Sequence, residues 1–155
     1  TTYSTMHTNQ DIQAQARDRA QDFAAAQSYV GIEYVPDYFD CAHLFFNVQK
    51  KVFGRTITLP SKFDAHALGR AGQAAQIRAA RDALASRIDG PQHGCAVLIV
   101  CATERGDCWH IGTVFEHKGE HWVLHNSRVM GNAALNRLSH FAKVGNRVEG
   151  FYTCN

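Results

Sequence analysis

The sequence predicts an α+β fold in a single domain spanning residues 1–155, with helices first and an antiparallel sheet after them. Apolar residues recur at helical spacing in the first part of the chain. Short apolar runs separated by turn signals follow the boundary at Gly90-Pro91. A length of 155 residues also suits one domain that can bury a hydrophobic core of its own.

Two early helices are indicated by their apolar spacing and by the residues at their ends. The first is expected from about Asn9 to Tyr29, before Gly31, with one apolar face: Ile12, Ala16, Phe23 and Ala26. The second is expected to begin after Asp40, whose carboxylate can accept from free backbone N–H groups, and to end at Gly54. Its buried stripe is Leu44, Phe45, Val48 and Val52.

The rest of the chain is expected to add one more helical stretch, a set of strands and a last helix. Residues 61–88 are alanine-rich, with Ile77, Ala80, Leu84 and Ile88 at helical spacing. Strands are expected at 95–101, 109–115 and 121–126, with a final strand at 148–152. Asn132 is expected to cap a helix that runs to about Lys143, and the histidines outside these strands, such as His93, are expected on loops or surfaces.

Cys41 stands in the first turn of the second helix. The unpaired N–H groups and the dipole of a helix N-terminus favour negative charge, so a thiol there is biased toward the nucleophilic thiolate. The alternative is a small core residue, which is the common role of a buried cysteine. Whether Cys41 is a nucleophile or a core residue depends on whether the strands place a general base beside it.

Two histidines on neighbouring strands are expected to share one face of the sheet. His110 and His125 have the same parity, and a turn centred near residues 117 and 118 puts them directly opposite each other. A two-residue shift leaves them diagonal neighbours within reach, whereas a one-residue shift separates them. A helix bearing Cys41 could pack on that face, so that one imidazole takes the thiol proton and the other orients it. Asn126 has the wrong parity for the orienting role, and Glu120 falls in the turn.

Six short motifs occur in an order that resembles the NlpC/P60 cysteine peptidases, which have a papain-like fold. They are Gly31-Ile32-Glu33-Tyr34, Phe39-Asp40-Cys41 with Leu44, Phe53-Gly54, Leu59-Pro60, His110-Ile111-Gly112-Thr113-Val114 and Val123-Leu124-His125. The matches span about residues 31–126, and residues 61–92 are unmatched. Among members of the family, the tail-associated cell-wall peptidases of phages and prophages look most similar.

The resemblance implies a hydrolase that cleaves amide bonds in bacterial peptidoglycan peptides, often between D-glutamate and the diamino acid. Cys41 would be the nucleophile, His110 the general base and His125 the orienting residue. Tyr34, Asp40 and His43 would form the oxyanion and substrate-binding region, although the family has a glycine where this chain has His43. Such an enzyme acts in the periplasm or cell wall, with phage tail proteins or, for a secreted antibacterial effector, an immunity protein as partner.

Other classes of function are weighed against this one. A non-catalytic tail or wall-binding component could keep the same fold, and His110, His121 and His125 could form a metal site, although no cofactor is expected. The formal charge of +2 gives no argument for nucleic acid, and no apolar run approaches the roughly 18 residues of a membrane span. Cys101 and Cys108 would face each other if the first hairpin turns between Glu104 and Arg105, either as two free thiols or as a disulfide.

Overall fold

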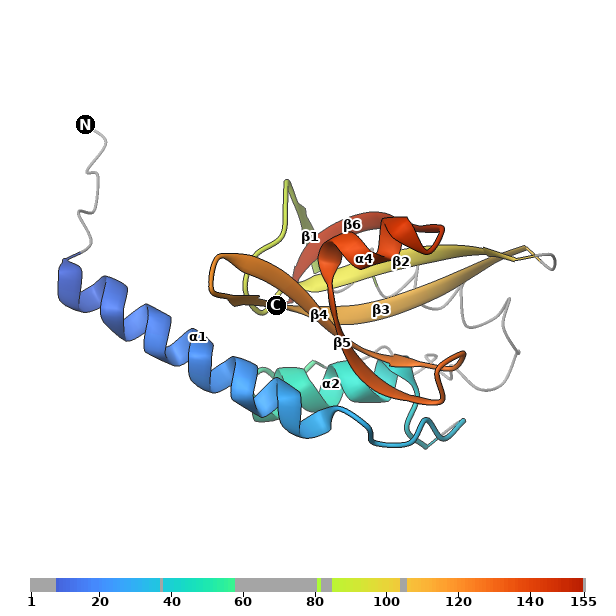
Figure 1. Cartoon of the computed structure of the whole chain (residues 1–155), viewed down its shortest axis with the longest axis horizontal. Coiled ribbons are helices and arrows are strands. Elements are labelled where there is room, and N and C mark those ends of the chain that lie inside the picture. The colour runs from blue at the N-terminus through green and yellow to red at the C-terminus, as the bar shows by residue number, and fades with distance from the viewer. Residues whose placement is uncertain (1–7, 37, 58–80, 82–84, 104–105, 155) are drawn as a thin grey trace.

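A computed structural model of the chain describes residues 8–36, 38–57, 81, 85–103 and 106–154, and shows an α+β architecture (Figure 1). In this described part of the chain, six antiparallel strands form one sheet in the order β1-β6-β2-β3-β4-β5. The strands are β1 (Ala85–Ile88), β2 (Ala96–Thr103), β3 (Gly106–His117), β4 (Glu120–Ser127), β5 (Asn132–Arg137) and β6 (Asn146–Cys154). The helices are α1 (Asn9–Tyr29), α2 (Cys41–Lys51) and α4 (Leu138–Lys143).

The helices α1 and α2 cover one face of the sheet. Successive strand residues point to opposite faces, and the apolar ones on this side meet the stripe of α2 that the sequence predicts. Phe115 and Leu124 pack with Leu44 and Val48, and Phe45 packs with strand residues farther along the sheet. Burial of these large side chains is the main force that fixes α2 against the sheet.

The opposite face of the sheet carries the short helix α4. Its Phe141 is buried among Val97, Ile99, Val114 and Val123, which come from the three strands β2, β3 and β4. His110 and His125 have the parity of these residues and therefore lie on this α4 side. The sheet thus separates most of α2 from the two histidines.

Only the second half of α1 is packed on the domain, and the first half extends beyond the sheet (Figure 1). Phe23 is buried and stacks on His117, with ring centroids 4.0 Å apart, whereas Ile12 is 54% exposed. The expected apolar face is therefore buried only from Phe23 onward. Among the described residues, no helix is both long enough and apolar enough to cross a bilayer.

His93 lies in the loop between β1 and β2, as predicted, but its side chain packs under α1 and is only 13% exposed. Its Nε2 is 2.7 Å from Asp22 Oδ2 on the helix, and its Nδ1 accepts from the backbone N–H of Glu116 at 2.9 Å. Arg19 on the same helix also forms an ion pair with Glu116. Arg19 therefore joins α1 to β3 directly, and His93 joins them indirectly by contacting both Asp22 and Glu116.

Two predicted helical stretches are wrong in part, the first over residues 85–88 and the second over residues 132–137, whereas Arg81 within the first is helical. Residues 85–88 form strand β1, because they pair with the end of β6 and Ile88 packs under α4; residues 58–80 and 82–84 lie outside the described part of the chain. Asn132 begins strand β5, which pairs along its whole length with β4, and the helix starts only at Leu138. The order of the strands in the sheet does not follow the order of the chain, since β6, the last strand, lies between β1 and β2.

Candidate active site

The segment before α2 is held so that Cys41 becomes the first residue of the helix. Asp40 caps the helix as predicted, since its Oδ1 accepts from the backbone N–H of His43 at 2.9 Å. The carbonyl of Phe39, the preceding residue, accepts from the side-chain amide of Asn126 at 2.7 Å. Asp40 and Cys41 are buried, and Cys41 is only 4% exposed.

Strands β3 and β4 turn at Lys118 and Gly119, which both have positive φ angles (51° and 75°), as a two-residue hairpin requires. The pairing runs from His117 opposite Glu120 to Thr113 opposite Leu124. Continuing this register puts Gly112, and not His110, opposite His125. The predicted shared face is therefore correct, and the register is the diagonal one that a two-residue shift produces.

The two histidines nevertheless make direct contact. His110 Nε2 lies 2.8 Å from His125 Nδ1, and the two rings meet edge to face. Gly112 is part of the reason, because a Cβ there would lie 2.6 Å from Val123 Cγ1 and 3.4 Å from His125 Cβ. The absence of a side chain at this position lets β3 and β4 come close enough for the imidazoles to meet.

The chain of hydrogen bonds continues beyond His125. His125 Nε2 lies 2.7 Å from Oδ1 of Asn136 on β5, and the edge of Phe141 closes the other side of the ring. Asn136 was missed from the sequence because this segment was assigned to a helix. Had residues 132–137 been assigned to a strand, the parity of Asn136 with His125 would have indicated the contact.

Cys41 approaches the residues of this hydrogen-bond chain from the opposite side of the sheet, through the backbone of Ile111. The prediction that α2 packs on the histidine face is wrong, because the large apolar side chains of β3 and β4 lie on the other one. The paired part of β3 and β4 ends at Thr113 and Leu124. Beyond this point the backbone N–H of Ile111, the residue after His110, hydrogen-bonds the sulfur of Cys41. The thiol therefore lies beside the strand position that carries the first imidazole.

The resting cysteine and histidine are both neutral, which differs from the predicted bias toward thiolate. Burial, and next the charge of Asp40, raise the pKa of Cys41 to about 12, although the N–H groups of Ile111 and Ala42 act in the opposite direction. Burial, and next the proximity of His125, lower the pKa of His110 to about 3. Burial lowers the pKa of His125 as well. The loss of solvation outweighs the favourable helix terminus at Cys41.

Tyr34 and His43 complete the surroundings of the thiol. Burial raises the pKa of Tyr34 to about 12, and the nearby Cys41 and Asp40 contribute to the shift, so the phenol lies close to both. His43 Nδ1 is 2.8 Å from Asp40 Oδ1, with its side chain 39% exposed. The structure thus gathers Tyr34, Asp40, Cys41, His110 and His125, and places His43 on the outer side of the buried carboxylate.

The described residues contain no group of three or more His, Cys, Asp or Glu side chains arranged to hold a metal ion. Nε2 of His110 and Nδ1 of His125 contact each other, and His121 does not take part in this contact.

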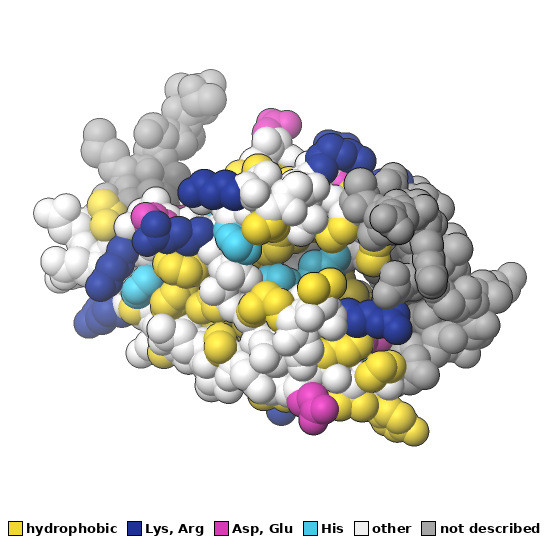
Figure 2. Space-filling model, turned by 45° about the vertical axis from the view of Figure 1, so that its right-hand side comes forward, with side chains coloured by type: hydrophobic (Ala, Val, Ile, Leu, Met, Phe, Trp, Pro, Cys, Tyr) yellow, Lys and Arg dark blue, Asp and Glu magenta, His cyan; other side chains and the backbone are white. Residues whose placement is uncertain are grey.

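Cys101 and Cys108 are directly opposite across the β2–β3 hairpin, as the predicted turn requires, and both are free thiols. Histidine side chains appear at the bottom of a hollow between hydrophobic ones in the middle of the view in Figure 2.

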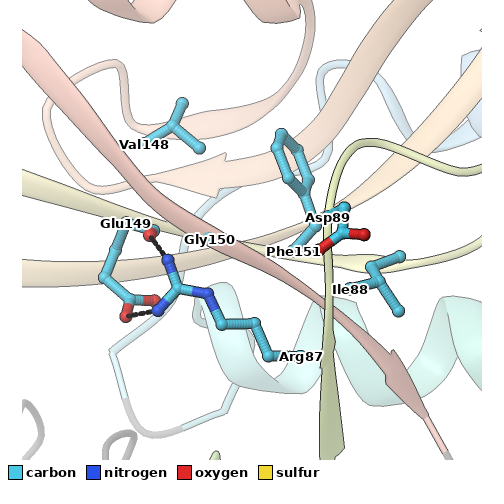
Figure 3. Close-up of a pocket in the computed structure, with 7 residues that line it drawn as sticks. All are labelled: Arg87, Ile88, Asp89, Val148, Glu149, Gly150 and Phe151. Carbon is cyan, nitrogen blue, oxygen red and sulfur yellow. Dashed lines mark hydrogen bonds and ion pairs between the residues drawn. The ribbon is translucent and has the colours of Figure 1, made fainter.

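A pocket of about 430 Å³ lies elsewhere, between the edge strand β1 and β6, and contains none of these residues (Figure 3). Arg87 lies along its floor, with Nη2 donating to the carbonyl of Glu149 at 3.0 Å and Nη1 3.6 Å from the carboxylate of the same residue. Arg81 and Tyr152 also bind the Glu149 carboxylate. Because Arg87 and Glu149 in this pocket are already paired with each other, it is a weaker candidate than the cysteine–histidine site.

Comparisons with known proteins add no family to this geometry. No model of a known protein family matches the chain, and a search of curated proteins finds no similar sequence.

Proposed function

We propose that the protein is a cysteine hydrolase of amide bonds, with Cys41 as nucleophile, His110 as general base and His125 as the residue that orients the base. The observation that carries the proposal is the contact between His110 Nε2 and His125 Nδ1 at 2.8 Å, next to a thiol bound by the N–H of Ile111. A nucleophile, a base and a group that orients the base are the parts of a catalytic triad. The neutral state of both histidines leaves the base able to accept a proton.

The reaction begins with a neutral thiol and a neutral imidazole. His110 takes the proton of Cys41 as the sulfur attacks the substrate carbonyl, and the resulting oxyanion is bound by the backbone N–H of Cys41 and the hydroxyl of Tyr34. Each such donor contributes on the order of 3 kcal/mol to the transition state. The imidazolium then protonates the leaving amine, which leaves a thioester on Cys41. A water molecule, deprotonated by His110, hydrolyses that thioester and restores the thiol.

The substrate class rests on the resemblance of the sequence motifs to the NlpC/P60 family with its papain-like fold. It implies stem peptides of bacterial peptidoglycan, cleaved at or near the bond between D-glutamate and the diamino acid. His43 replaces a glycine of the family pattern and lies 2.8 Å from buried Asp40, so a side chain stands where the family leaves space. We therefore propose that His43 affects which peptide bond is cleaved, because its side chain lies beside the substrate-binding region.

Digestion of purified peptidoglycan tests the proposal. Wild-type protein is expected to release soluble peptide fragments with new amino termini, whereas Cys41→Ala and His110→Ala are expected to release none. Cys154→Ser is the matched control, because Cys154 is a half-buried cysteine on β6 and is expected to leave release unchanged. Release that persists in Cys41→Ala would contradict the nucleophile. Binding of the sacculus by wild type without any release would instead favour a non-catalytic wall-binding component.

A further inference from the structure

The contacts between His110, His125 and Asn136 form one continuous line of hydrogen bonds. All donors in such a line point the same way along it. A neutral imidazole carries one N–H and one bare nitrogen, so each ring donates at one end and accepts at the other. The state of one end of the line therefore determines the state of the other. Asn136 stands at the end that faces away from Cys41.

The end at Asn136 is an acceptor. Its Oδ1 lies 2.7 Å from His125 Nε2, and a carbonyl oxygen can only accept, so Nε2 of His125 carries the hydrogen. Because burial keeps His125 neutral, its Nδ1 is bare. This Nδ1 lies 2.8 Å from His110 Nε2, which must then be the donor of that bond.

The consequence falls on the other nitrogen of His110. With its hydrogen on Nε2, neutral His110 has a bare Nδ1, which is the only ring atom left to receive the proton of Cys41. The opposite direction would begin with the amide nitrogen of Asn136 donating to His125 and would end with a hydrogen on Nδ1 of His110. That arrangement has no base, since both ring nitrogens of His110 would be unable to accept the thiol proton.

We propose that Asn136 is a positioning residue, which through its carbonyl oxygen sets the tautomers of both histidines and leaves Nδ1 of His110 free to act as the base. The inference about tautomers rests on the two hydrogen-bond distances together with the burial of His125, and its catalytic part rests on the proposed hydrolase function. A neutral amide suits this position because it fixes the donor direction of these hydrogen bonds without placing a charge in a buried site. Among the described residues, His140 on α4 also acts on His125 and lowers its pKa, in the same direction as burial.

Nitrogen NMR of the histidine rings tests the tautomers directly, without any substrate. In wild-type protein labelled with ¹⁵N and held near pH 7.5, His110 and His125 are each expected to show a protonated Nε2 and a bare Nδ1. Asn136→Ala removes the acceptor and is expected to give His125 mixed tautomers. Asn136→Asp keeps an acceptor oxygen and is expected to keep the hydrogen on Nε2 of His125, while its added charge also favours protonation of Nδ1. Asn132→Ala, four residues away on the same strand and face, is the matched control and is expected to keep the wild-type spectrum.

Kinetics then separate a positioning role from a structural one. Asn136→Ala is expected to lower kcat of the proposed hydrolysis by about 100-fold with little change in KM, since general-base catalysis contributes 10²–10⁴-fold. A hydrogen on Nδ1 of His110 in the wild-type protein would overturn the inference, and so would an unchanged spectrum in a folded Asn136→Ala protein. Expected tautomers with no hydrolysis of peptidoglycan would instead refute the proposed function and leave the tautomer assignment intact.

Discussion

Replacing Gly112 with alanine tests whether the contact between the two histidines depends on the close approach of β3 and β4. The new Cβ would lie 2.6 Å from Val123 Cγ1 and 3.0 Å from the carbonyl oxygen of Leu124. Val123 is fully buried and β-branched, and the second neighbour is backbone, so neither can move away at little cost. Overpacking of this kind costs about 1–3 kcal/mol in the free energy of unfolding. For a domain of this size each 1 kcal/mol lowers the melting temperature by roughly 2–4 °C.

The assay is urea unfolding of Gly112→Ala, Val123→Ala and the double variant, with peptidoglycan release measured in parallel. Val123→Ala removes the atom that clashes, so the alanine at 112 is expected to cost at least about 1 kcal/mol less in that background, a coupling typical of residues in contact. Gly90→Ala is the matched control, because its Cβ would meet no atom within 4 Å. A Gly112→Ala protein within about 0.5 kcal/mol of wild type, or a coupling near zero, would refute the reasoning.

Three further predictions concern buried ionisation, the attachment of α1 and the thiols of the first hairpin. Burial lowers the pKa of His110 from 6.5 in the unfolded protein to about 3 in the folded one. Between these pH values the unfolded protein binds a proton on His110 that the folded protein does not bind, so the free energy of unfolding is highest above pH 6.5 and decreases as the pH falls toward 3. The urea stability of wild type is therefore expected to drop more between pH 7.5 and pH 4.5 than that of His110→Gln, and equal slopes would contradict the burial of this ring. Asp22→Ala removes the partner of His93 Nε2 and is expected to cost about 1 kcal/mol and to speed amide exchange in α1, whereas Asp18→Ala on the exposed side of the same helix should do neither. Mass spectrometry after alkylation of the unfolded, non-reduced protein is expected to find one label on Cys101 and one on Cys108, and a loss of both labels would reveal a cross-strand disulfide.

The parts of the site that the sequence could predict are those that follow from local chemistry. Asp40 caps α2 because a short carboxylate before an apolar stripe suits free N–H groups, whatever the rest of the chain does. The shared face of His110 and His125 follows from strand parity, which survives a two-residue error in register. Both predictions needed only residues close to one another in sequence.

The parts that could not be predicted depend on contacts between distant segments. Asn136 became visible only when residues 132–137 paired with β4, a pairing that their composition does not distinguish from a helix. The neutral state of Cys41 reflects burial by the whole domain, which outweighs a helix terminus that favours the thiolate. The side of the sheet on which α2 packs was set by Phe115 and Leu124, and not by the histidines.

The place of β6 in the sheet has a consequence for how the protein folds during synthesis. Of the six strands in the described part of the chain, β6 is the last to leave the ribosome, yet it lies between β1 and β2 in the sheet. Strand β1 ends more than 50 residues before β6 begins. Until it arrives, β1 has no partner and β2 presents an open apolar edge, which is a site for aggregation. The sheet can therefore be completed only after β6 has been made through residues 151–154, which pair with β1, and these long-range pairings predict slow folding. A nascent chain stalled before that point is expected to need a chaperone to stay soluble.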